Sequence, residues 1–134
     1  MSAWGISNFE NDTALDWVAY LIEEKQGINF KKFIDTFVSE FTPDETSLIE
    51  CSKFLTVAET VAGLTGNPAD DFPEELSDWI ETKYIKIEQV TLDKAIEGVK
   101  LVMVDSEAKE MYLDSGYFKS WEKAQKDLIK RLSE

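Results

Sequence analysis

One stretch decides the fold class of this chain: Phe30-Lys31-Lys32-Phe33-Ile34-Asp35-Thr36-Phe37-Val38-Ser39-Glu40-Phe41. Its apolar residues recur every three or four positions, which is the spacing of one face of an α-helix. The stretch therefore predicts an amphipathic helix that packs its apolar face against a core. An aromatic stripe at this spacing could instead line a ligand pocket, but core packing is the commoner role.

The same helical spacing recurs on both sides of this stretch, and no segment shows sustained strand-like alternation. We expect helices over roughly 13–25, 30–41, 43–62, 73–84, 92–105, 106–115 and 117–132. The sequence thus predicts an all-α fold, a compact bundle of about five to seven amphipathic helices. We expect a single helical domain over residues 1–134, with residues 1–12 as an N-terminal anchoring arm.

Several local features predict where helices begin and how they pack. Thr13, with Asp16 three residues later, has the pattern of a capping box for the first helix, and Leu15 is expected on its buried stripe. Thr42-Pro43-Asp44-Glu45 predicts the start of the third helix, and Thr91 predicts the cap of the fifth. Gly98 lies inside that helix at a cost of about 1 kcal/mol relative to Ala, so we expect a neighbouring helix to approach closely there.

The charge is strongly negative: 27 acidic residues against 14 basic ones give a net charge of −13. Such a charge repels nucleic acid phosphates and anionic lipid, so we expect neither as a partner. It would attract a basic protein, although solubility alone is the simpler explanation. Residues 101–134 are nearly balanced, and the lysines of the last helix form a basic face. The oligomeric state stays open.

The residue types needed for common chemistries are scarce. The chain has no histidine, one cysteine (Cys51) and one arginine (Arg131), which excludes imidazole catalysis and the usual zinc sites. Cys51 lies on the apolar side of its helix, where a core role is expected. The densest acidic cluster, Asp70-Asp71 with Glu74-Glu75, does not match the EF-hand spacing and suits a helix N-terminus. We expect no catalytic residue, no metal and no cofactor.

The compartment is predicted from three features. Cys51 cannot form an internal disulfide, residues 1–12 contain no Lys or Arg, and the longest apolar run, 101–104, is far too short to span a membrane. We therefore expect a cytoplasmic, soluble protein.

The first seventeen residues carry a specific motif. Ser2-Ala3-Trp4-Gly5, Phe9-Glu10-Asn11-Asp12 and Ala14-Leu15-Asp16-Trp17 follow one another closely. This pattern resembles an uncharacterised bacterial family that opens Gly-Ala-Trp-Gly-x-x-x-Phe-x-Asn-Asp and is catalogued only as a domain of unknown function. Ser106-Glu107 and Phe118-x-x-Trp121 also resemble its pattern, whereas Ser2 replaces its usual Gly. The resemblance implies a bacterial helical domain and transfers no catalytic residue.

The motif has two interpretations. As an anchoring arm, it would bury two aromatic rings, turn tightly at the glycine and start the first helix with Asn11 or Asp12. As a functional element, it would border a ligand or partner site. The candidate site residues are Trp4, Gly5, Phe9, Asn11, Asp12 and Asp16.

The function predicted first is a non-catalytic protein-interaction module. The alternatives are an acidic, immunity-type antagonist of a basic partner protein, and a carboxylate-based metal-binding protein or enzyme.

Overall fold

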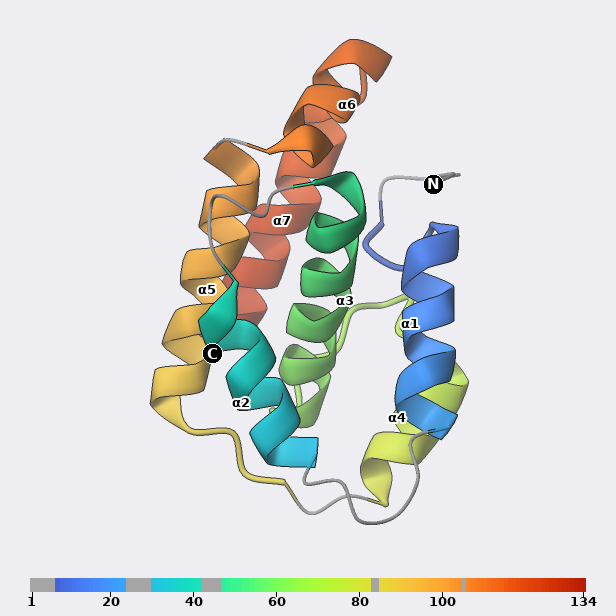
Figure 1. Ribbon diagram of the computed structural model, residues 1–134, viewed down its shortest axis with the longest axis vertical. Helices are drawn as coiled ribbons and strands as arrows, with labels where there is room; N and C mark the ends of the chain where they lie inside the picture. Colours follow the sequence, from blue (N-terminus) through green and yellow to red (C-terminus); the bar gives the residue numbers. More distant parts are fainter. Residues whose placement is uncertain (1–6, 24–29, 42–46, 83–84, 105) are drawn as a thin grey trace.

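The computed structural model describes residues 7–23, 30–41, 47–82, 85–104 and 106–134. These residues contain α-helices and no β-strand, which confirms the all-α prediction (Figure 1). In chain order the helices are α1 (Asp12–Glu23), α2 (Phe30–Glu40), α3 (Leu48–Leu64), α4 (Glu74–Glu81), α5 (Gln89–Val104), α6 (Glu107–Ser115) and α7 (Phe118–Ser133). None of the described helices is both long and apolar enough to cross a membrane.

Helix α3 is the central element, and each of the other six helices packs against it. Figure 1 shows α1 and α4 on one side of α3, with α2 and α5 on the other. Because it is surrounded, α3 buries its polar side as well as its apolar side, including Ser52, Glu59 and Thr60. The hydroxyls of Thr56 and Thr60 donate to backbone carbonyls one turn earlier, at 2.8 and 2.9 Å, so these buried groups keep hydrogen bonds.

A second, smaller cluster joins α1 to α4 beside the main core. Its buried members are Phe9, Val18 and Leu76, and Phe72 packs against them. The rings of Phe9 and Phe72 meet edge to face with centroids 5.6 Å apart. This cluster fixes α4 alongside α1.

The close approach predicted at Gly98 is confirmed. A Cβ atom built on Gly98 would overlap Cζ of Phe54, whose ring is fully buried in α3. Phe54 in turn stacks on Phe41 with ring centroids 4.0 Å apart. Glycine is therefore what allows α5 to pack this closely against α3.

Two predictions about α1 are wrong. The helix begins at Asp12, and its cap is Asn11, whose Oδ1 accepts a hydrogen bond from the Ala14 amide at 2.8 Å. Thr13 is consequently inside the helix. Leu15, expected in the core, is 41% exposed, because the buried positions of this helix are Ala14, Val18 and Leu21.

Two other predicted helix starts are wrong, whereas the ends of α6 are confirmed. Helix α3 begins at Leu48 and is capped by Ser47, whose hydroxyl accepts from the Glu50 amide at 3.3 Å; residues 42–46 lie outside the described residues. Thr91 lies within α5, and its hydroxyl donates to Asp35 of α2 at 2.6 Å. Helix α6 begins after Ser106 and ends at Gly116, which has φ +84°.

Candidate functional site

The side of the N-terminal arm that faces the bundle is buried through Asn8, Phe9 and Asn11, each 5% exposed. Asn8 pairs with Gln125 of α7 through two reciprocal amide hydrogen bonds, of 3.0 and 2.8 Å. The Asn8 amide also donates to Glu59 of α3 at 2.9 Å. The arm is thus hydrogen-bonded at once to the central helix and to the last one.

The negative charge of Glu59 is balanced by Arg131, the single arginine of the chain. Arg131 Nη1 lies 2.8 Å from Glu59 Oε1, and Arg131 Nε lies 2.8 Å from Asp127 Oδ2. Burial lowers the pKa of Arg131, but the hydrogen bond and charge of Glu59, together with Asp127, outweigh burial and raise it. We call Asn8, Glu59, Gln125 and Arg131 the polar network.

A cavity of about 20 Å³ lies beside this network, between the arm and helices α3, α6 and α7. That volume holds about one water molecule. The polar groups that line it are already engaged, since the Ser52 hydroxyl donates to Asn11 at 2.8 Å and Asn8 binds Glu59 and Gln125. In residues 7–11, the inner side of the arm therefore stabilises the fold, and the cavity beside it is too small for a substrate.

The structure describes four of the six predicted site residues and divides these four into two groups. Trp4 and Gly5 lie outside the described residues. Phe9 and Asn11 point into the bundle, as an anchoring arm requires. Asp12 and Asp16 are exposed on the opposite side of α1. The structure therefore does not bring the four described residues into one site.

The outer side of α1 presents a continuous exposed stripe. Its members are spaced three or four residues apart and are Asp12, Leu15, Asp16, Ala19, Tyr20 and Glu23. The carboxylates follow the middle of the stripe, while Leu15 and Tyr20 lie on its two edges. This arrangement places apolar surface beside negative charge.

Helix α4 extends this negative surface. Its exposed side carries Glu74, Glu75, Asp78 and Glu81, and the second core cluster packs α4 against α1. Neither α1 nor α4 contains a lysine or an arginine. We call the seven exposed acidic side chains of these two helices the acidic face; they are Asp12, Asp16, Glu23, Glu74, Glu75, Asp78 and Glu81.

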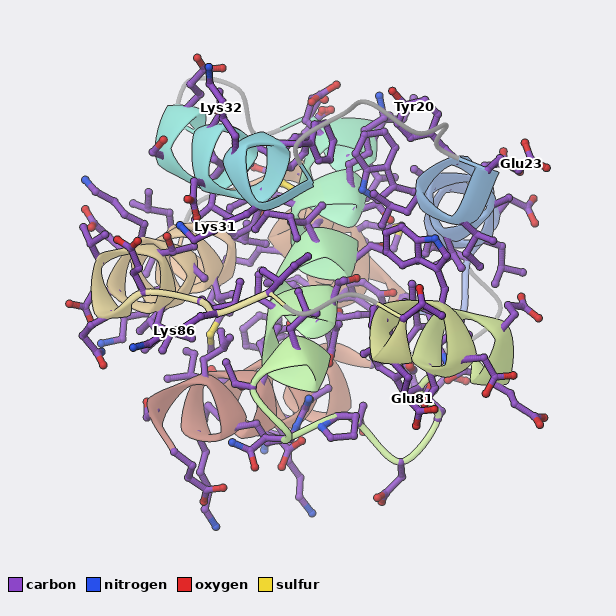
Figure 2. The ribbon with its side chains drawn as sticks, turned by 90° about the horizontal axis from the view of Figure 1, so that it is seen from below. Tyr20, Glu23, Lys31, Lys32, Glu81 and Lys86 are labelled. Carbon is purple, nitrogen blue, oxygen red and sulfur yellow. The ribbon has the colours of Figure 1, made fainter. Side chains whose placement is uncertain are left out.

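Basic side chains gather on other parts of the molecule. Figure 2 shows Lys31, Lys32 and Lys86 on the side away from Glu23 and Glu81. Helix α7 exposes a stripe of lysines at helical spacing, namely Lys119, Lys123, Lys126 and Lys130. Helices α1 and α4 thus carry acids without a lysine or arginine, whereas each of the other described helices carries both signs, a distribution that a net charge of −13 does not reveal.

Aromatic rings border the acidic face where α1 meets α2. Trp17 and Tyr20 stack with centroids 5.1 Å apart and an interplanar angle of 13°. The rings of Phe33 and Phe37 of α2 also contact Trp17, with ring centroids 6.0 and 5.5 Å from that of Trp17. On the same ring, Lys53 Nζ lies 5.7 Å from the centroid. Tyr20 thus packs one face of its ring against Trp17.

The groups considered for catalysis or metal binding are not arranged for either role in the described part of the chain. Cys51 is fully buried, as predicted, and burial raises the pKa of its thiol to about 11, which disfavours a thiolate nucleophile. Within residues 7–23, 30–41, 47–82, 85–104 and 106–134, no three Cys, Asp or Glu side chains lie close enough to share a metal ion. Asp71, from the acidic cluster, accepts a hydrogen bond from the Ser7 hydroxyl.

The polar network was not predicted from the sequence. Asn8, Glu59 and Gln125 come from three distant parts of the chain, and no local spacing connects them. A usable signal was present: Glu59 is an acid inside the most apolar helix, and Arg131 is the single arginine available to balance it.

Comparison with known proteins identifies one family. The profile of the domain of unknown function DUF4259 matches residues 2–124. No curated protein and no solved structure gives a significant match. Because the matched region covers nearly the whole chain, including the N-terminal arm and the first six helices, the chain belongs to the DUF4259 family.

Proposed function

We propose that this protein is a non-catalytic interaction module that binds a basic protein through its acidic face. The observation that carries the proposal is the clustering of seven exposed acids on α1 and α4, two neighbouring helices without a basic residue. Opposite charge on a partner would speed association and orient it toward this face.

Part of the acidic face has an explanation within the isolated protein. Asp12, Glu74 and Glu75 lie in the first turns of their helices, where the helix dipole favours acids. Asp16 and Asp78 lie one turn further on, four residues after Asp12 and Glu74, where like charges repel by a few tenths of a kcal/mol per pair. A partner that supplies positive charge would relieve that repulsion. Leu15 and Tyr20 add apolar surface that such a partner would bury.

An immunity-type antagonist is one specific form of this proposal, in which the basic partner is a protein whose activity is blocked by the contact. A cytoplasmic location belongs to the same proposal, and the buried, unpaired thiol of Cys51 supports it because a reducing compartment would leave that thiol intact. No contact among the described residues favours the carboxylate-based enzyme or metal protein.

Two matched variants test the proposal. The first neutralises the acidic face with D16N, E23Q, D78N and E81Q together. The second changes the total charge equally through exposed acids of α5 and α6, with D93N, E97Q, E110Q and D114N. Tagged wild-type protein and both variants are used to capture proteins from the native host at about 50 and 500 mM salt.

We expect basic proteins to bind the wild type and the second variant at low salt, and to be lost from the first variant and at high salt. Equal capture by the two variants would show that total charge, and not the acidic face, determines binding, and would overturn the proposal.

A further inference from the structure

We draw no further inference here: the strongest candidate, the aromatic patch of Trp17, Tyr20, Phe33 and Phe37 between α1 and α2 beside the acidic face, carries none because nothing in the structure shows what covers it.

Discussion

Asn8 and Gln125 lie 117 residues apart in the chain and pair their side-chain amides head to head, each donating one hydrogen bond to the other. The pair is buried, and the second N–H of Asn8 donates to Glu59. The arm that precedes α1 is thereby bonded to α3 and α7 through buried side chains.

Replacing Asn8 with alanine should lower the free energy of unfolding by about 2–4 kcal/mol, because buried donors and acceptors of Gln125 and Glu59 lose their partner. The isosteric N8D should cost at least as much at neutral pH, since it places a second carboxylate beside Glu59. Urea denaturation of the two variants measures both losses of stability.

The control is Q89A, which removes an exposed amide and is expected to change the free energy of unfolding by less than about 0.5 kcal/mol. A similar effect of N8A and Q89A would contradict this role.

The Glu59–Arg131 pair should behave as a coupled unit. R131M leaves the Glu59 carboxylate buried without its counter-ion, at an expected cost of about 3–5 kcal/mol. In the double variant E59Q/R131M no unbalanced charge remains, so much of that stability should return. A double-mutant cycle by chemical denaturation measures the coupling, and additive single effects would show that the two charges act independently.

The contact between Gly98 and Phe54 predicts that G98A destabilises the protein although alanine is the better helix former. The gain of about 1 kcal/mol in helix propensity should be outweighed by overpacking against a fully buried ring, for a net loss of about 1–3 kcal/mol. The same substitution in an F54L background should be nearly neutral, because the end of the ring that meets the new methyl group is gone. Thermal unfolding of the four proteins gives the comparison.

The fold was more predictable than the site because helix patterns are local. The stripe of α2 and the caps Ser106 and Gly116 could be identified from a few neighbouring residues. Where two local signals compete, the structure decides between them. Ser47 and Glu50 form a capping-box pattern that starts four residues after Pro43, and it is Ser47 of this second pattern that caps α3.

Burial at α3 and the formation of the acidic face depend on which helices become neighbours. The polar residues of α3 look like a solvent-facing side until six helices surround it. Likewise, Asp16 and Asp78 belong to one surface because the second core cluster packs α1 against α4, a contact between segments about 60 residues apart. No spacing in the sequence reports either arrangement.

The buried thiol of Cys51 should make the protein sensitive to alkali. Burial raises the pKa of Cys51 from its ordinary value of 9.0 to about 11, so its contribution to stability is complete below pH 9 and is lost as the pH rises toward 11. The loss should approach about 2–3 kcal/mol. Unfolding curves of wild type and C51A between pH 8 and 11 measure it, with C51A showing the shallower decline.

Alkylation gives an independent check on the same thiol. Native protein should react with iodoacetamide at pH 8 far more slowly than protein in urea, because the sulfur is fully buried and protonated. Equal rates in the two conditions would show that the thiol is accessible in the folded state.

The absence of lysine from α1 and α4 has a practical consequence for attaching the protein to surfaces. Exposed lysines lie on α2, α5 and α7, and Figure 1 shows α2 and α5 on the other side of α3 from α1 and α4. Within the described residues, a sensor chip coupled through lysine amines would hold the molecule by those other helices. The carboxylates of α1 and α4 would then remain open to whatever flows past.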